Sequence, residues 1–140
     1  MRVTTKGQYG LSFMIELAKL EDGKPIPLRV IAQKLKISEP YLEQIIILLK
    51  KGTFLKSTRG VNGGYLLAKK TEEITAYEIL NTVESHLDVV ESETDADPDF
   101  GKQYLFEQLQ NAVTDVLQNV TLKDLVERSS GEQDNYMYFI

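Results

Sequence analysis

The sequence has 140 residues, and none of them is cysteine. This absence excludes disulfide bonds, thiolate metal sites, cysteine-ligated iron–sulfur clusters and cysteine nucleophiles. The only histidine, His86, has no cysteine or second histidine to act with, so we expect no metal site and no catalytic role for it. Long apolar runs are also missing: the longest aliphatic run, Ile45–Leu49, is too short to cross a membrane, and the first residues contain no signal-peptide stretch. We therefore expect a cytoplasmic protein without a cofactor.

Catalytic constellations are absent as well. The 21 acidic residues form no spaced group of the kind that acid–base catalysis requires, and the sequence has no phosphate-binding G-x-x-x-x-G-K-[ST] motif. The acidic stretch Asp95–Asp99 resembles the start of a calcium loop, but Phe100 and Phe106 stand where such a loop needs Gly and Glu. We predict that the protein is not an enzyme, with an enzyme acting through carboxylates alone as the alternative.

What the sequence does have is an uneven distribution of charge. Residues 1–70 carry 13 Lys and Arg against 5 Asp and Glu, a net charge of +8, whereas residues 71–140 carry 3 against 16, a net charge of −13. The overall net charge of −5 is therefore the sum of a basic half and an acidic half. A basic N-terminal module suits nucleic acid, and an acidic module does not.

Apolar residues recur at helical spacing along the basic half. The predicted helices span residues 6–20, 27–35 and 39–50. Thr5 and Gln8 have the spacing of a capping box for the first of them, and Ser38 is a good N-cap for the third. The third helix has apolar residues at i, i+3, i+4 and i+7, which predicts a buried face made of Leu42, Ile45, Ile46 and Leu49.

Two short β segments follow, at residues 54–58 and 65–67, around a glycine-rich turn. Two short helices joined by a tight turn and followed by a hairpin form the order of a winged helix-turn-helix. Thr75 and Glu78 then make a second capping box, which predicts a fourth helix through Val83.

The acidic half is predicted to contain one long helix, at residues 104–120, after an acidic loop at residues 85–103. Apolar residues of this helix step by 4, 4, 3 and 4, which gives a seam narrow enough for a partner helix. The predicted dimerisation seam consists of Leu105, Leu109, Val113, Val116 and Val120. Thr121 caps one more short helix, and the chain ends in the apolar tail Tyr136, Met137, Tyr138, Phe139 and Ile140.

The predicted fold is therefore mostly α with a small β-hairpin wing (α+β), a winged helix-turn-helix followed by a long C-terminal dimerisation helix. We divide the chain into a DNA-binding domain at residues 1–84, the acidic loop at 85–103, and residues 104–140 with the dimerisation helix, the short helix and the tail.

The outward face of the third helix carries groups that can read bases. Gln44 can pair bidentately with adenine, and Glu43 can accept a hydrogen bond from the amino group of cytosine. A solvated helix face is the alternative for both residues. Arg59 precedes the glycine-rich turn, where it can enter a minor groove or reach a guanine, and its alternative is a solvated turn residue. The candidates for phosphate contacts, which position a protein without specifying sequence, are Arg2, Lys6, Lys50, Lys51 and Lys56.

Three ordered motifs, Thr5–Gly10, Ser38–Gln44 and Arg59–Tyr65, resemble the bacterial winged-helix regulators that include IscR, NsrR and CymR. The resemblance covers the whole chain and implies a homodimeric transcription factor that binds a two-fold symmetric operator in double-stranded DNA. It places Tyr41 on the reading helix beside Glu43 and Gln44, and it adds Ser38 and Gly60 to the predicted interface. Pro40 departs from the small polar residue that other members often have, which removes a possible hydroxyl contact.

The missing cysteines are the second departure, because cluster-binding members place three of them in the loop that is acidic here. The resemblance is therefore to the CymR-type branch, whose members repress sulfur uptake and cysteine synthesis genes together with cysteine synthase, the O-acetylserine thiol-lyase. That enzyme is the implied sensor partner, and residues 136–140 are the predicted partner-binding tail. The alternatives are packing of this tail on the protein's own dimer, a cluster-free regulator of another regulon, and an adaptor that binds no DNA.

Overall fold

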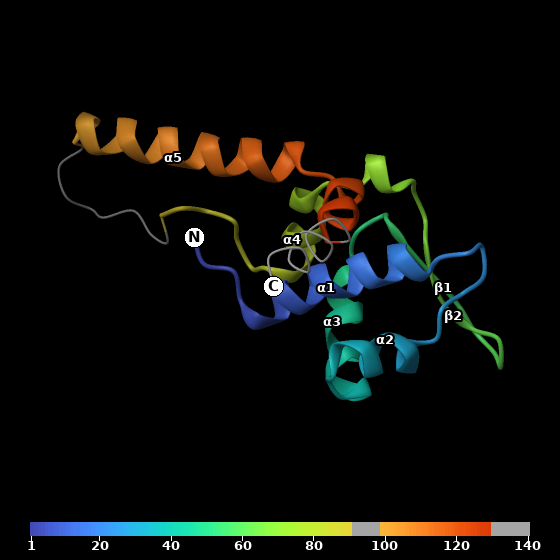
Figure 1. The fold of residues 1–140 in the computed structure, drawn as a ribbon. Helices are drawn as coiled ribbons and strands as arrows, with labels where there is room; N and C mark the ends of the chain where they lie inside the picture. The colour runs from blue at the N-terminus through green and yellow to red at the C-terminus, as the bar shows by residue number, and fades with distance from the viewer. Residues whose placement is uncertain (91–98, 130–140) are drawn as a thin grey trace, which may run out of the picture.

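A computed structural model describes residues 1–90 and 99–129 of the chain (Figure 1). Its elements in chain order are α1 (Thr5–Leu20), α2 (Leu28–Leu35), α3 (Glu39–Leu49), β1 (Leu55–Thr58), β2 (Gly64–Leu67), a 3₁₀ turn η1 (Thr71–Glu73), α4 (Ala76–Val83) and α5 (Phe100–Asn119). Residues 122–129 are also helical. The predicted fold class, mostly α with a β-hairpin wing, is confirmed, whereas the tail at 136–140 and residues 91–98 of the acidic loop lie outside the described residues.

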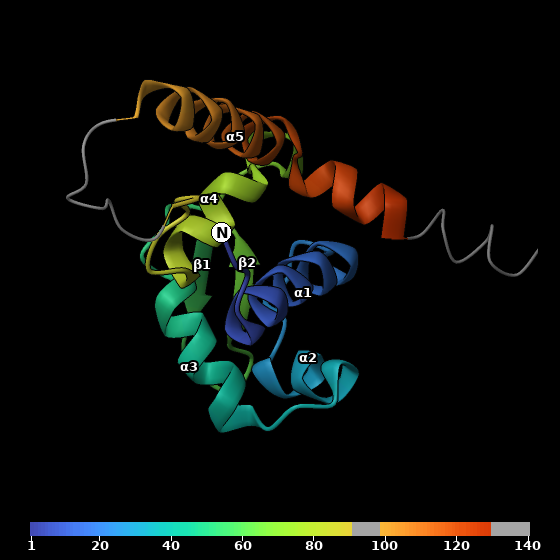
Figure 2. The same ribbon diagram turned by 90° about the vertical axis from the view of Figure 1, so that its left-hand side faces the viewer.

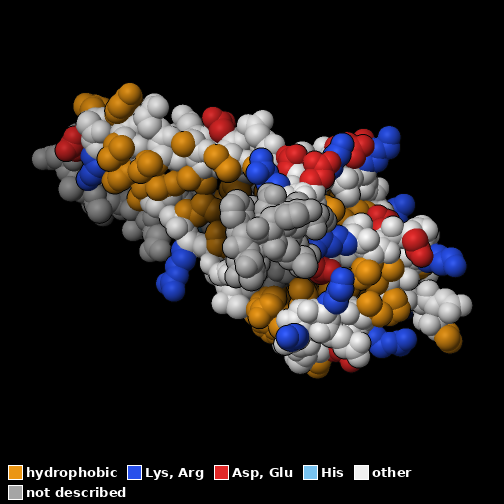
Figure 3. All heavy atoms as spheres, viewed as in Figure 1, with side chains coloured by type: hydrophobic (Ala, Val, Ile, Leu, Met, Phe, Trp, Pro, Cys, Tyr) orange, Lys and Arg blue, Asp and Glu red, His pale blue; other side chains and the backbone are white. Residues whose placement is uncertain are grey.

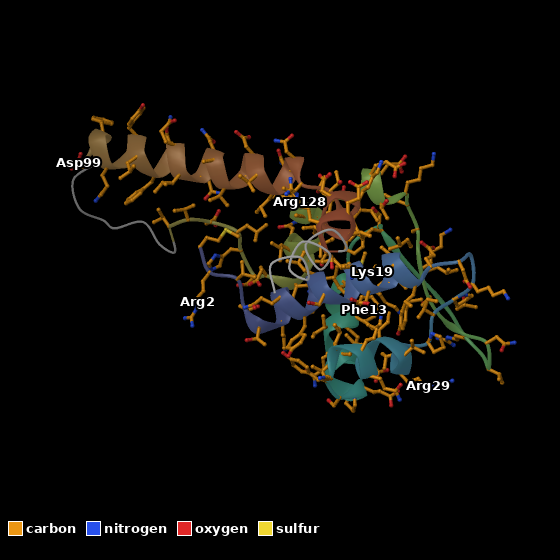
Figure 4. The ribbon with its side chains drawn as sticks, viewed as in Figure 1. Arg2, Phe13, Lys19, Arg29, Asp99 and Arg128 are labelled. Atoms are coloured by element: carbon orange, nitrogen blue, oxygen red, sulfur yellow. The ribbon has the colours of Figure 1, made fainter. Side chains whose placement is uncertain are left out.

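The core forms where α1 packs against α2, α3, α4 and β2. The four residues predicted for the inner face of α3 are all buried, as the helical spacing indicates. Phe13 of α1 is fully buried at the centre of this core (Figure 4), and its ring meets the ring of Tyr65 edge to face at 5.9 Å. The helix-turn-helix is therefore held as one packed unit with the hairpin.

The first helix starts one residue earlier than the capping pattern predicts. Thr4, and not Thr5, is the N-cap of α1, and its hydroxyl oxygen accepts a hydrogen bond from the Gly7 N–H at 3.1 Å. The backbone N–H and the hydroxyl of Thr4 both donate to the carboxylate of Glu84, at 2.9 and 2.8 Å. Glu84 is buried, so these two bonds satisfy a carboxylate that would otherwise be costly to remove from water. A contact 80 residues away thus selects between two adjacent threonines.

The hairpin is anchored by a third extended segment. The strands β1 and β2 are antiparallel, with Leu55 opposite Leu67 and Thr58 opposite Gly64. Ile26, in the connection between α1 and α2, exchanges two backbone hydrogen bonds of 2.9 Å with Tyr65. The hairpin is therefore fixed to the segment that leads into the helix-turn-helix and does not depend on its own two strands alone.

The long helix α5 begins at Phe100, four residues before the predicted start at 104. Asp99 is its N-cap and accepts hydrogen bonds from the Gly101 and Lys102 N–H groups. Residues 100–103, predicted as part of the acidic loop, are therefore helical, because an Asp in the cap position satisfies the first free N–H groups. No described helix is long and apolar enough to cross a membrane.

The helix α5 lies at the end of the molecule opposite α2 and the hairpin tip, and both views agree on this (Figures 1 and 2). Gln110 ties it to the segment after α4, because its side chain accepts from the Val89 N–H and donates to the Leu87 carbonyl. Thr121 and Asp124 form a complete capping box for residues 122–129, which confirms the predicted short helix. Leu122 is fully buried and belongs to the core that the helix-turn-helix shares with Ile74.

Candidate nucleic-acid interface

The turn between α2 and α3 sets the direction of α3, which the sequence predicts to read DNA. Lys36 adopts a left-handed conformation with φ of 58°, and the N–H groups of Lys36 and Ile37 bond to the Gln33 and Ala32 carbonyls, as in a Schellman motif. Ser38 then caps α3 by accepting from the Tyr41 N–H at 3.2 Å, which confirms its predicted capping role. This cap uses a lone pair of the hydroxyl oxygen, so the hydroxyl proton can still be donated to a phosphate.

The outward face of α3 is available to a partner. Glu43 and Gln44 are both exposed, as is Pro40 in the first turn of the helix. Tyr41 is half-buried and meets the ring of Tyr9 edge to face, with ring centroids 6.0 Å apart. Tyr41 is therefore fixed against α1, whereas Glu43 and Gln44 can approach base edges, which agrees with the helical spacing used to predict them.

The wing is anchored at its base and open at its tip. Arg59 and Gly60 are exposed at the turn, and Gly60 has φ of 109°. At the base, the Tyr65 ring packs on the core with the Lys50 ammonium 5.6 Å from its centroid. Burial, together with the nearby Glu43 carboxylate, raises the pKa of the Tyr65 hydroxyl, so it stays protonated at neutral pH. Residues from α3 and the hairpin thus meet around one side chain.

Six cations predicted to contact DNA are exposed and carry no competing ion pair. Within residues 1–90 and 99–129, no carboxylate forms a salt bridge with Arg2, Lys6, Lys50, Lys51, Lys56 or Arg59. Other lysines of the basic half are engaged: Lys34 bonds to Glu16 at 3.0 Å, and Lys69 bonds to Glu78 at 3.3 Å. Cations without a carboxylate partner are the ones that can release counterions by binding phosphates.

The structure adds Arg29, which the sequence patterns did not single out. It lies on α2, is exposed, and points away from the body at the end that carries α2 and the hairpin tip (Figure 4). Arg2 also points away from the body, on the side of the N-terminus (Figure 4). Because the first helix of a helix-turn-helix crosses the DNA backbone, an exposed Arg on α2 was a signal that the sequence contained.

The predicted dimerisation seam is partly open on α5. Leu105, Leu109 and Val116 are exposed, and Val113 is half-buried. Val120 does not continue the predicted helical seam: α5 ends at Asn119, and Val120 is a half-buried, extended residue whose carbonyl accepts from the Ala76 N–H. Figure 3 shows hydrophobic side chains gathered along α5, and acidic side chains beside its C-terminal end. An apolar stripe of this kind needs a cover in water, and it lies away from the basic end of the molecule.

Comparison with known proteins supports the winged-helix fold and identifies a family. Residues 3–128 match the model of the Rrf2 family, which is described as iron-dependent transcriptional regulators. Over the whole of both chains, the sequence is 41% identical to the HTH-type transcriptional regulator CymR of Bacillus subtilis strain 168. The solved structure of CymR, the global cysteine regulator of B. subtilis, matches with TM-score 0.81 and 39% identity, over 91% of this chain and 97% of that one. A proposed transcriptional regulator from Listeria innocua matches with TM-score 0.83 and 45% identity, over 92% of this chain and 88% of that one.

The iron in that family description finds no fitting ligands in the described residues. The sequence has no cysteine to supply a thiolate. Among residues 1–90 and 99–129, no group of three His, Asp or Glu side chains converges on a point where a metal ion would sit. The described residues therefore do not fit a resident iron site.

Proposed function

Because this chain belongs to the Rrf2 family of transcriptional regulators, we propose that it is a homodimeric repressor that binds a two-fold symmetric operator through α3 and the wing. Family membership makes it a DNA-binding regulator and not an enzyme. The observation that carries the finer proposal is the exposed face of α3, at the end opposite α5, with cations around it that form no salt bridge to any described carboxylate. Such a regulator acts on DNA in the cytoplasm.

In this proposal, the two kinds of contact have separate roles. Gln44 and Glu43 read base edges in the major groove, and Arg59 enters the minor groove beside it. The basic side chains, with Ser38 and Gly60, hold the phosphate backbone and fix the register of α3. A carboxylate that faces DNA repels phosphates, so Glu43 is useful there only if it accepts from a cytosine amino group.

Dimerisation through α5 follows from the exposed seam. Leu105, Leu109 and Val116 would be covered by the same residues of a second copy, since a two-fold interface pairs a surface with itself. The acidic half would then lie at the dimer centre, away from the duplex, and the two copies of α3 would face two half-sites. The spacing of the half-sites would follow from the spacing of the two α3 helices.

The regulon that we propose is sulfur uptake and cysteine synthesis, with O-acetylserine thiol-lyase as the sensor partner. The support is the likeness to CymR, whose B. subtilis structure is named for the global cysteine regulator. The test is a gel-retardation experiment with the promoter of a cysteine-uptake gene, with and without the thiol-lyase. No retardation in either condition would remove the sulfur proposal and favour a cluster-free regulator of another regulon.

Replacing Arg59 with alanine is expected to weaken operator binding by at least about thirtyfold, because an Arg–base or Arg–groove contact contributes about 1–3 kcal/mol and the dimer has two of them. Dimerisation should be unchanged. Fluorescence anisotropy with a labelled duplex and sedimentation measure the two properties separately. Arg128→Ala is the matched control, because it removes an exposed guanidinium group from the helix at residues 122–129. Equal affinities for the wild type and Arg59→Ala would show that the Arg59 side chain contributes nothing to the free energy of DNA binding.

Deleting Phe139 and Ile140 is expected to abolish binding to the thiol-lyase while DNA binding persists. The reason is that an aromatic and aliphatic segment after acidic residues suits capture in an enzyme groove. Residues 136–140 lie outside the described residues, so this step rests on the sequence. Calorimetry with the purified thiol-lyase measures the affinity. An undiminished affinity would instead favour packing of this segment on the protein's own dimer.

A further inference from the structure

Besides Met1, two large apolar side chains of the basic half are exposed without an assigned role. In the described part of the chain, large exposed apolar side chains occur at Met1, at five positions of α5, and at Ile47 and Val61. The α5 residues belong to the seam and its extension. Ile47 is 61% exposed in the last turn of α3, and no described residue covers this exposed part. A helix that only faced water would gain more from a Lys or Glu at this position, because both have higher helix propensity than Ile.

The neighbours of Ile47 define what can cover it. It lies one helical turn after Glu43 and Gln44, and Lys50 and Lys51 follow at the C-terminal end of α3; all four residues are exposed. An apolar protein surface placed over Ile47 would remove these four polar or charged groups from water without satisfying them. A duplex would instead supply phosphates for the lysines and base edges for the glutamate and glutamine. Charge complementarity therefore favours DNA as the occupant of this face.

The major groove offers one apolar group, the C5-methyl of thymine. The helical rise of about 1.5 Å per residue places Ile47 roughly 4.5 Å beyond Gln44 along α3, which is close to the ~3.4 Å spacing of stacked base pairs. We propose that Ile47 reads the methyl group of a thymine beside the base pair that Gln44 contacts. This inference rests on the proposed function and adds a specificity-determining residue to it.

Replacing thymine with uracil tests the proposed contact of Ile47 with the methyl group, because uracil keeps every hydrogen-bonding group of thymine and lacks only the methyl. The full-length protein first enriches a duplex from a randomised pool, and each thymine of that duplex is then replaced by uracil. One thymine position in each half-site should be sensitive. Replacing that thymine in a single half-site should weaken binding of the wild-type protein about fourfold, and replacing it in both half-sites roughly fifteenfold, as expected for burial of one methyl group at each. Ile47→Ala should bind the unmodified duplex more weakly and lose nothing further at that position.

Val61→Ala is the control, because it removes another exposed aliphatic side chain from the basic half but lies outside α3. It should keep the full response to uracil. The melting temperature of Ile47→Ala should match that of the wild type, since the side chain has few contacts to lose. If uracil affects the wild type and Ile47→Ala equally at every thymine, or affects neither, the thymine contact is refuted while DNA binding stands. If no duplex is enriched at all, the proposed function fails and this inference fails with it.

Discussion

Raising the salt concentration from about 50 to about 200 mM is expected to weaken duplex binding by about 10³-fold or more. Six exposed cations in each protomer have no carboxylate partner among the described residues, and a protein that neutralises six to ten phosphates loses about 10³–10⁵ in affinity over this range. The measurement is the slope of log affinity against log salt concentration. A slope near zero would favour the adaptor that binds no DNA.

Variants that each lack one positive charge can show which cations determine the salt dependence of duplex binding. Lys6→Gln removes one candidate phosphate contact from each protomer, so the slope for the dimer should fall by about 2. Lys102→Gln removes an exposed cation from α5, at the opposite end of the molecule, and should leave the slope unchanged. An equal change in both variants would mean that the slope reports overall charge and not a defined basic face.

Gly64→Ala is expected to lower the free energy of unfolding by about 3 kcal/mol or more. Gly64 has φ of 151°, which costs an L-residue about 1–3 kcal/mol, and a methyl group there would overlap the backbone carbonyl of Ile26. The Ile26 and Tyr65 backbones are paired at this point, so relief of the overlap would break the bond pair that anchors the wing. Denaturant unfolding followed by circular dichroism measures the change.

Gly23→Ala separates the cost of backbone strain from the cost of overlap with the Ile26 carbonyl. Gly23 also has a positive φ, of 91°, but an added methyl group would meet nothing within 4 Å. This control should therefore show backbone strain alone, about 1 kcal/mol. If both variants lose the same stability, the contact with Ile26 contributes nothing to the cost at Gly64, and the wing is held by its own strands.

Local patterns predicted the helices well, because each depends on residues within a few positions of each other. The buried face of α3 and the caps at Ser38, Thr75 and Thr121 all follow from spacing of three or four residues. The start of α1 could not be fixed in this way. The local capping-box pattern favours Thr5, because Gln8 follows it by three residues, whereas Thr4 is the N-cap and bonds to Glu84, which no local pattern connects to it. The burial of the Glu84 carboxylate likewise cannot be predicted from the spacing of hydrophobic residues.

In the candidate site, too, features fixed by local spacing were predicted, whereas features fixed by distant contacts were not. Exposure of Glu43 and Gln44 follows from the periodicity of α3, so the sequence was sufficient to predict it. The pairing of Ile26 with Tyr65 was not predicted, since a single bridged residue between two helices leaves no alternating pattern to detect. Arg29 was missed although the sequence placed it on the predicted second helix, and the fold adds that it lies at the same end of the molecule as the wing.

The burial of Leu122 has a consequence for how the chain folds as it is made. Leu122 packs with Ile74 in the core of the winged helix, and a backbone hydrogen bond of 2.8 Å joins the two residues. Ribosomes add about 5–20 residues per second, so roughly 6–24 s pass before residue 122 is synthesised. Throughout that time the nascent helix-turn-helix has an incomplete core with apolar surface in contact with water. The core of the winged helix is therefore completed only after residue 122 has been made, and until then this apolar surface is open to non-native contacts.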